Sequence, residues 1–423
     1  MKRTVNLGII GLGNIGCGVA ALFEKNKNLI NERLGVQVHL AKAADISESC
    51  RKKSGLAKEI LTEDARQIIN DPQIDIVVEA IGGEKPAREF ILSALKKGKH
   101  VVTPNKEVIA KHLEEFLTVA RANNVKILFE AAVGGGIPII CTLRNPLLAN
   151  KITEVYGIVN GTTNYILTKM AQENKSFNQA VKEAQEMGFA ESNPASDIEG
   201  QDAAYKAAIL SAVAFRSKID FRKVYFEGIA KIALEDLQFA DRMGYAIKLL
   251  AIAKKEDQSL DVRVHPVLLP KNHLLSSVNN EINAIYIKGN AVDEQMLSGK
   301  GAGALPTGSA IWGDISEIIS GNGADLELKN HYPIKSIFET ESRYYVRLKV
   351  EDHFGVLEKI AGLFAGEKVS IDAVHQQETN GTIASLVIIL HKVKDQNFQK
   401  AIARIKSLKV VKEVSSVIRV GLK

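Results

Sequence analysis

Residues 1–130 alternate between short apolar runs and longer stretches with a helical period. The apolar runs have the length of buried strands and lie at residues 5–10, 36–44, 74–78, 100–103 and 125–129. Helical patterns occupy residues 15–25, 87–97 and 107–123. Regular alternation of strand and helix is typical of a doubly wound parallel sheet. The pattern therefore predicts an α/β domain at the N-terminus.

The first apolar run leads directly into a glycine-rich turn, Gly11-Leu-Gly13-Asn-Ile-Gly16. In a dinucleotide-binding fingerprint, the first glycine permits the tight turn, the second lets the backbone approach the pyrophosphate, and the third lets the helix pack on the strand. Free N–H groups at the start of the helix, at Asn14 and Ile15, would favour the phosphates. The motif predicts a Rossmann-like nucleotide-binding domain, with a ligand-free glycine turn as the alternative.

Charged residues follow the second strand. Asp45 comes directly after it and could accept a hydrogen bond from the ribose 2′-OH of NAD. Arg51 and Lys52 follow closely and could instead bind the 2′-phosphate of NADP. All three side chains are also compatible with a solvated surface. The sequence leaves the choice between NAD(H) and NADP(H) open.

Ligands of such sheets bind beyond the carboxyl ends of the strands, so the residues after the third and fourth strands matter most. Gly82 follows the third strand, and Thr103-Pro-Asn-Lys106 follows the fourth. Lys106 would bring a cation towards the nicotinamide end of the crevice, where it could polarise a carbonyl or deliver a proton. The alternative is a surface lysine at a helix entry.

A polar segment, residues 191–206, precedes an apolar helix. It contains Glu191, Asp197, Asp202 and Lys206, and the last two are spaced to meet on one helical face. Burial would lower the pKa of Lys206 unless an adjacent carboxylate stabilises its charge. The segment indicates a site for a polar substrate, and an ordinary exposed ion pair is the alternative.

A different pattern begins after the irregular stretch 321–340. Strands and helices are predicted, in order, at residues 343–350, 356–367, 369–376, 382–391, 398–408 and 414–420. The order βαββαβ is that of a ferredoxin-like module. We therefore predict a separate small domain at the C-terminus.

Five motifs taken together resemble homoserine dehydrogenase. They are residues 11–16, 103–107, 157–165, 191–206 and 301–308, and the resemblance covers residues 1–325. It implies a reversible, NAD(P)H-dependent reduction of L-aspartate 4-semialdehyde to L-homoserine in the biosynthesis of threonine, methionine and isoleucine. It also implies a homodimer or homotetramer.

The resemblance assigns roles to individual residues. Glu191 and Asp197 are implied to bind the amino end of the substrate, and Asp202 assists. Lys206 and Lys106 flank the reacting oxygen, and the sequence does not decide which one supplies the proton. Further substrate and cofactor contacts are implied at Asn160, Gly161, Thr162, Thr163, Gly303 and Thr307.

The run Glu130-Ala-Ala-Val-Gly-Gly-Gly136-Ile resembles the family segment that coordinates a monovalent cation. The implied ligands of Na⁺ or K⁺ are Glu130, Val133, Gly135 and Ile137. The ion would have a structural role. Three consecutive glycines are equally typical of a flexible hinge.

The first turn of the C-terminal module, Asp352-His-Phe-Gly355, makes it resemble an ACT domain. Such domains bind amino acids between paired copies, and L-threonine is the implied effector. The implied contacts are Asp352, Gly355, Val356, Leu357, Ser370 and Ile371. Phe354 stands where the family usually has proline, so a module that only stabilises an oligomer is the alternative.

The resulting domain plan has four parts. Residues 1–138, completed by 300–325, form the nucleotide-binding domain, and 139–299 form an α+β substrate and dimerisation domain. Residues 326–342 are a linker, and 343–423 form the ACT domain.

Composition agrees with a cytoplasmic enzyme. The net charge of +6 is scattered and implies no nucleic acid, and the three cysteines have no metal spacing. No signal peptide or membrane-spanning run is evident. Two rival functions stay open: a non-catalytic sensor of nucleotide and amino acid, and a different amino-acid dehydrogenase. An aldehyde-oxidising type would need a cysteine nucleophile, for which Cys141 offers no setting.

Overall fold

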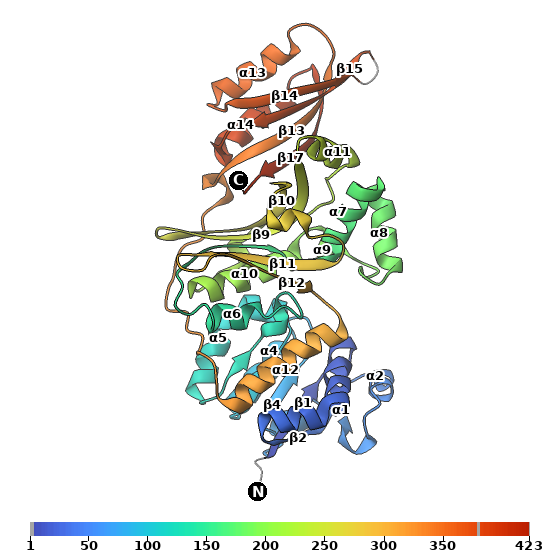
Figure 1. Cartoon of the computed structure of the whole chain (residues 1–423), viewed down its shortest axis with the longest axis vertical. Helices are drawn as coiled ribbons and strands as arrows, with labels where there is room; N and C mark the ends of the chain where they lie inside the picture. The colour runs from blue at the N-terminus through green and yellow to red at the C-terminus, as the bar shows by residue number, and fades with distance from the viewer. Residues whose placement is uncertain (1–3, 379–380, 423) are drawn as a thin grey trace.

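The computed structural model describes residues 4–378 and 381–422. Three parts follow one another along the long axis of the molecule, with the N-terminal domain at one end and the C-terminal domain at the other (Figure 1). No helix in these residues is long and apolar enough to cross a membrane.

The N-terminal domain is built on a six-stranded parallel sheet with the order β3-β2-β1-β4-β5-β6. Its strands are β1 (Thr4–Ile10), β2 (Gln37–Ala44), β3 (Leu61–Thr62), β4 (Ile76–Glu79), β5 (His100–Val102) and β6 (Ile127–Leu128). Its helices are α1 (Asn14–Leu34), α2 (Glu48–Lys53), α3 (Arg66–Asn70), α4 (Ala87–Lys96) and α5 (Lys106–Ala122). The predicted doubly wound, Rossmann-like fold is confirmed.

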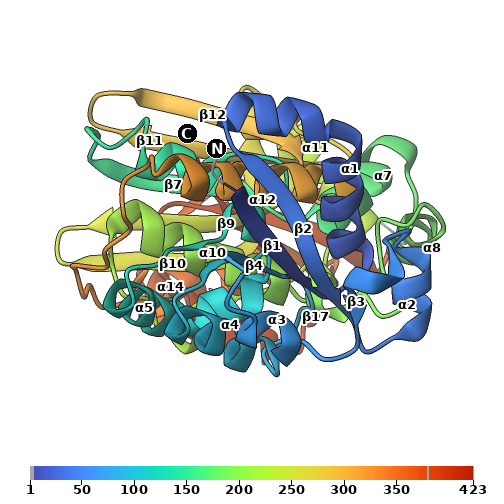
Figure 2. The same cartoon turned by 90° about the horizontal axis from the view of Figure 1, so that it is seen from below.

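Helices cover both faces of this sheet. Seen from below, β1 and β2 lie between α1 and α12 on one side and α3, α4 and α5 on the other (Figure 2). Helix α12 (Ala304–Ser320) returns from the far end of the sequence to complete the domain. A Cβ at Gly18 of α1 would lie only 2.5 Å from the carbonyl oxygen of Ala304, so glycine is what lets the two helices meet. Trp312 stacks on Phe23 with ring centroids 5.2 Å apart.

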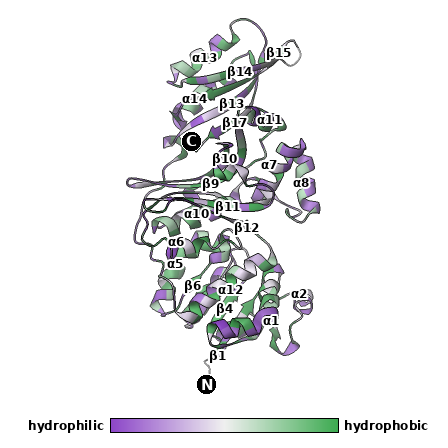
Figure 3. Cartoon of the chain, in the orientation of Figure 1, coloured by the Kyte–Doolittle hydropathy of each residue, from purple (hydrophilic) through white to green (hydrophobic). Residues whose placement is uncertain are grey.

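The middle domain is an antiparallel sheet, ordered β12-β11-β7-β9-β10, with helices against it. Its strands are β7 (Ile152–Ile158), β8 (Tyr225–Phe226), β9 (Tyr245–Glu256), β10 (Ser259–Pro270), β11 (Ile282–Gly289) and β12 (Asp293–Lys300). Its helices are α6 (Ile139–Arg144), α7 (Gly161–Glu173), α8 (Phe177–Glu186), α9 (Ala195–Ile198), α10 (Gln201–Phe215) and α11 (Leu234–Arg242). The outer helix α8 is largely hydrophilic, as Figure 3 shows.

The C-terminal domain has the predicted βαββαβ order with one short extra strand, β16. Its elements are β13 (Glu341–Glu351), α13 (Val356–Gly366), β14 (Ile371–Glu378), β15 (Ile383–Leu390), β16 (Val393–Lys394), α14 (Asp395–Lys406) and β17 (Val411–Val420). Short 3₁₀ turns elsewhere in the chain lie at Lys58–Ile60, Glu130–Ala132, Phe221–Lys223, Leu274–Ser277 and Ile337–Glu339.

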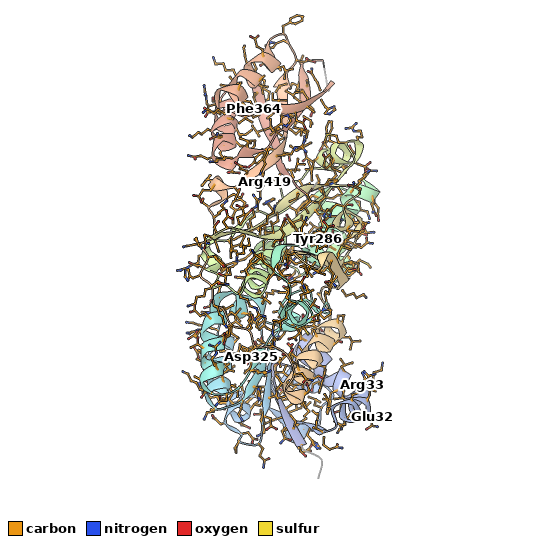
Figure 4. All side chains as sticks on the ribbon, turned by 60° about the vertical axis from the view of Figure 1, so that its left-hand side comes forward. Glu32, Arg33, Tyr286, Asp325, Phe364 and Arg419 are labelled. Carbon is orange, nitrogen blue, oxygen red and sulfur yellow. The ribbon has the colours of Figure 1, made fainter. Side chains whose placement is uncertain are left out.

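The middle and C-terminal domains share one sheet. Strand β17 pairs in parallel with β10, at Val267 with Arg419 and at Leu268 with Val420, and the combined sheet has eleven strands. Arg419 therefore lies where the two domains meet (Figure 4). Segment 326–342, predicted as a linker, lies against the middle domain, where Leu260 bonds to the backbone of Pro333 and Lys335.

A buried ion pair crosses the same junction. The guanidinium of Arg347, on β13, donates to both carboxylate oxygens of Asp236, on α11, at 2.7 and 3.2 Å. The side chain of Asp236 is fully buried and also accepts a hydrogen bond from Tyr345. The two domains are thus joined by packing and charge as well as by the chain.

Candidate active site

The glycine turn after β1 has the geometry that a dinucleotide needs. Gly11 has a φ of +98°, and a Cβ at Gly16 would lie 1.8 Å from the carbonyl oxygen of Gly11. A Cβ at Gly13 would meet nothing within 4 Å, so a ligand can approach the backbone there. Helix α1 begins at Asn14, followed by Ile15, and directs its N-terminus at this space. These residues fit a pyrophosphate.

Asp45 and Arg51 lie beside the turn. One oxygen of Asp45 accepts the amide of Leu12 at 2.7 Å and the other accepts the amide of Ser47 at 2.8 Å. The Arg51 guanidinium bonds to the backbone oxygen of Asp45. Lys52 points to solvent and pairs with Glu48 at 2.7 Å. Asp45 thus has a structural contact with the turn.

The loops after β4 and β5 are tied together by Glu79, a residue that the sequence analysis missed. Its carboxylate accepts hydrogen bonds from the Thr103 hydroxyl at 2.6 Å and the Ile81 amide at 2.8 Å. Burial raises the pKa of Glu79, and these hydrogen bonds oppose the shift. Gly82 lies in the first loop, exposed, with a φ of +74°. An acid at the end of an otherwise apolar strand was the available signal.

Asp202 lies between two lysines from different domains. Its carboxylate oxygens lie 2.9 Å from the Lys106 ammonium of α5 and 2.7 Å from the Lys206 ammonium of α10. Lys206 also donates to the carbonyl oxygen of Val159 at 2.7 Å. Burial alone would raise the pKa of Asp202, but the charges of Lys206 and Lys106 outweigh it and lower that pKa. The structure therefore brings the three predicted catalytic residues together.

The charge of Asp202 also raises the pKa of Lys106, against the opposing effect of burial. The Lys106 side chain is 45% exposed, whereas that of Lys206 is 11% exposed. Both ammonium groups are therefore available as proton donors, one close to solvent and one enclosed.

The predicted substrate residues surround the same carboxylate. Asn160 donates to Asp197 at 2.7 Å and to Asp202 at 2.8 Å. Its side-chain oxygen Oδ1 accepts the Thr163 amide at 2.8 Å, and this hydrogen bond caps α7. Thr162 donates to Phe189 O at 2.6 Å and lies 3.2 Å from Asp197.

Burial, together with the charge of Asp202, raises the pKa of Asp197. A positively charged ligand group would relieve this unfavourable crowding of carboxylates. Glu191 is exposed at the edge of the cluster, and its charge contributes to the raised pKa of Lys106. At Gly161 a Cβ would lie 2.8 Å from the carbonyl oxygen of Glu281, so this turn also requires a glycine.

Two further predicted cofactor residues lie at the start of α12. Gly303 precedes the helix with a φ of +117°, and Thr307 is buried and donates its amide to Gly303 O at 3.1 Å. The segment just before α12 lies against the glycine run 134–136, since a Cβ at Gly135 would be 2.5 Å from Gly301 O.

The candidate cation segment is folded as an irregular turn. Both oxygens of Glu130 accept backbone amides of α6, from Ile140 at 2.7 Å and Cys141 at 2.6 Å. Burial raises the pKa of Glu130 to about 7. Val133 and Ile137 are buried beside it. Among the residues that the structure describes, no three acidic, histidine or cysteine side chains are grouped to hold a metal ion.

The candidate effector residues lie at the turn into α13 and the start of β14. Gly355 caps α13 with a φ of +82°, and Asp352 accepts a hydrogen bond from Gln376 at 3.1 Å. Val356 is buried, Ile371 is half-buried, and Leu357 and Ser370 are exposed.

Comparison with known proteins identifies all three domains. Residues 138–316 match the homoserine dehydrogenase family, 11–130 its NAD-binding domain, and 344–410 the ACT domain. The homoserine dehydrogenase of Bacillus subtilis is 38% identical over 430 residues, covering 99% of this chain and 98% of that protein. That of Corynebacterium glutamicum is 39% identical over 425 residues, covering 98% and 95%.

Solved structures agree. A homoserine dehydrogenase from Thiobacillus denitrificans has a TM-score of 0.94 at 37% identity, covering 100% of this chain and 99% of that one. A hyperthermophilic archaeal homoserine dehydrogenase in complex with NADPH has a TM-score of 0.66 at 28% identity, covering 76% and 99%. The resemblance inferred from the motifs is confirmed: the chain belongs to the homoserine dehydrogenase family and is a nicotinamide-dependent oxidoreductase with a C-terminal ACT domain.

Proposed function

We propose that Lys106, Lys206 and Asp202 carry the proton chemistry of the reversible reduction of L-aspartate 4-semialdehyde to L-homoserine. The observation that carries this assignment is the Asp202 carboxylate, which lies 2.9 and 2.7 Å from the two ammonium groups. Bound NAD(P)H supplies the hydride. An aldehyde oxygen placed between the two lysines is polarised by both charges, and the developing alkoxide takes a proton from one of them.

The two lysines differ in their surroundings, and this suggests a division of labour. Lys206 uses N–H groups on Val159 O and Asp202, which fixes the remaining one for the substrate oxygen. Lys106 is half exposed and can regain a proton from solvent. We assign the proton transfer to Lys106 and the fixed hydrogen bond to Lys206.

The acids around Asn160 suit the amino end of the substrate. Asp197 has a raised pKa among neighbouring carboxylates, so an incoming ammonium stabilises its charged form. Glu191 supplies a second negative charge at the open side of the site. The remaining substrate residues are Asn160, Gly161, Thr162 and Thr163, which form and cap the start of α7.

Steady-state assays with L-aspartate 4-semialdehyde test the assignment. Lys106→Ala and Lys206→Ala are each expected to lower kcat by about 10² or more, because proton transfer and charge stabilisation are lost. NADPH binding should be retained in both. A near-normal kcat would remove that lysine from the mechanism, and nucleotide binding without turnover in the unsubstituted protein would favour the sensor.

We propose NADPH as the preferred cofactor, with NADH also accepted. The carboxylate of Asp45 already accepts hydrogen bonds from two backbone amides. The guanidinium of Arg51 bonds to the backbone oxygen of Asp45, and its positive charge offsets the negative charge of the Asp45 carboxylate. The hydroxyls of Ser47 and Ser49, 2.9 Å apart, are further donors at the place for a 2′-phosphate. The NADPH complex of an archaeal relative supports this choice. Arg51→Ala should lower kcat/KM for NADPH about tenfold while changing that for NADH little.

We propose that Na⁺ or K⁺ binds in a structural role at the turn formed by Glu130, Val133, Gly135 and Ile137. Because both carboxylate oxygens of Glu130 accept amides, the ligands here are mainly main-chain carbonyl oxygens, which suit a hard cation. The test compares thermal stability in KCl, NaCl and choline chloride at equal ionic strength. Equal stability in all three would argue against the site.

We propose that the ACT domain binds an amino acid, L-threonine, at Asp352, Gly355, Val356, Leu357, Ser370 and Ile371. The support is a group of exposed apolar side chains at this turn and on the edge strand β14: Phe354 is 100% exposed, Leu357 43% and Val374 36%. A second ACT domain would cover them. Isothermal titration calorimetry, in which L-threonine is added to the unsubstituted protein and to the Asp352→Ala variant, tests the site.

We propose a homodimer, or a homotetramer, formed through the middle domain. The sheet face opposite α10 carries a cavity of about 720 Å³ bordered by Tyr156, Tyr286 and Ile252 from three neighbouring strands. Tyr286 is on this sheet in Figure 4. Light scattering tests the oligomeric state.

The substrate and the three unpaired cysteines fit a cytoplasmic location.

A further inference from the structure

We infer that Glu79 is a positioning residue for the reaction: its buried carboxylate ties the loop after β4 to the turn after β5 and so sets where Lys106 enters the site. This inference rests on the proposed role of Lys106. Glu79 does not contact Lys106 itself, and it acts through the backbone of the turn.

The first half of the connection is the loop after β4. The Glu79 side chain is 1% exposed, and its Oε1 accepts the amide of Ile81 at 2.8 Å. The amide of Gly82 also bonds to this carboxylate. One end of the carboxylate therefore fixes the start of the loop that contains Gly82 and Gly83.

The second half is the turn after β5. Oε2 of Glu79 accepts the Thr103 hydroxyl at 2.6 Å, and the same hydroxyl oxygen accepts the Asn105 amide at 3.0 Å. Asn105 then caps α5 through the Val108 amide at 3.2 Å and donates to Gly83 O at 2.7 Å. Lys106 is the first residue of this helix. The path from Glu79 to Lys106 therefore runs through hydrogen bonds between three buried residues, Glu79, Thr103 and Asn105, and then along the backbone into the helix.

The geometry explains why a carboxylate stands at this buried position. Its neighbours are N–H and O–H donors from two separate loops, and a carboxylate has acceptor positions for all of them. An apolar residue would leave these donors unsatisfied, and the two loops would lose their common contact. A displacement of a catalytic group by about 1 Å can cost up to about 10² in rate.

The test is a double-mutant cycle between Glu79 and Lys106. Glu79→Ala should lower kcat about tenfold or more in the parent protein but less than about twofold in the Lys106→Ala background, because there is then no ammonium left to position. KM for NADPH should change less than kcat. Glu79→Gln should recover most of kcat, since its oxygen accepts the Ile81 amide and its NH₂ donates to Thr103.

Glu115→Gln is the matched control. Glu115 lies in the same domain and pairs with Arg88 across α4 and α5 at 2.7 Å, outside the loops. It should leave kcat unchanged.

Equal loss of kcat on Glu79→Ala in both backgrounds would overturn the inference, because the residue would then support the fold alone. A Lys106→Ala protein with normal kcat would instead refute the proposed function, and the inference with it. If Glu79→Ala does not fold, Thr103→Val against Thr103→Ser asks the same question, and equal kcat in those two would contradict the path.

Discussion

Replacing Asp202 with asparagine removes one charge from the centre of the site and keeps its shape. The carboxylate is 3% exposed and pairs with both Lys106 and Lys206. Asparagine can still accept one hydrogen bond, but it no longer offsets the two ammonium charges. The direct consequence is a change in the proton affinity of Lys106, whose pKa is raised mainly by Asp202.

The size of the effect follows from distance and exposure. Two unit charges about 3 Å apart attract by about 5 kcal/mol at an effective dielectric constant of about 20. Solvent screens this attraction because the Lys106 side chain is 45% exposed, so we take about 1–2 kcal/mol. The carboxylate favours the charged ammonium. Without it, Lys106 therefore loses its proton at a lower pH.

The assay is the pH dependence of kcat/KM for aldehyde reduction, from neutral to strongly alkaline solution. In Asp202→Asn the alkaline limb should move to lower pH, and kcat at neutral pH should fall by about 10². Asp241→Asn is the control, since Asp241 pairs with Lys271 at 2.6 Å on the surface and is 73% exposed. An unchanged alkaline limb, or one that moves up, would refute the charge argument.

Three further substitutions probe other parts of the molecule. Gly16→Ala should weaken NADPH binding at least tenfold in an equilibrium titration, because its Cβ would lie 1.8 Å from Gly11 O. Arg347→Ala leaves Asp236 buried without its ion-pair partner and should cost about 3–5 kcal/mol of unfolding free energy in a denaturant titration; a loss below about 1 kcal/mol would contradict this. Burial lowers the pKa of Lys248 from 10.5 to about 8, so unfolding takes up a proton in that interval and stability should rise with pH there, by roughly 3 kcal/mol. Lys248→Met should abolish this rise, which thermal unfolding at several pH values would detect.

The sequence predicted the parts of the fold that local pattern determines. The strand, glycine turn and helix at residues 5–25 are contiguous, so one window contains the whole fingerprint. The same applies to the C-terminal domain, where each of the predicted strands and helices is evident from its own local pattern. The polar segment 191–206 was recognisable because Asp202 and Lys206 are one helical turn apart.

Contacts between segments that are distant along the chain could not be predicted from the sequence. Glu79 looks like the last residue of an apolar strand, and only the folded sheet brings it to Thr103. Lys106 and Asp202 meet because α5 and α10 pack at the domain boundary, which no local period reveals. Similarly, the carboxylate of Glu130, expected at a cation, caps α6 as well, and a cap formed from outside the helix has no sequence signature.

The shared sheet of the middle and C-terminal domains limits how the two can move. A swivel of the C-terminal domain would break the β10–β17 ladder, whereas a change of twist can spread along it without loss of hydrogen bonds. Strand β10 also pairs with β8, and just beyond β8 the amide of Ile229 donates to the carbonyl oxygen of Ile198, next to Asp197. The C-terminal domain and the strands near the proposed substrate site therefore belong to one continuous sheet, so twisting of that sheet, and not rotation about a hinge, would connect movements of the two.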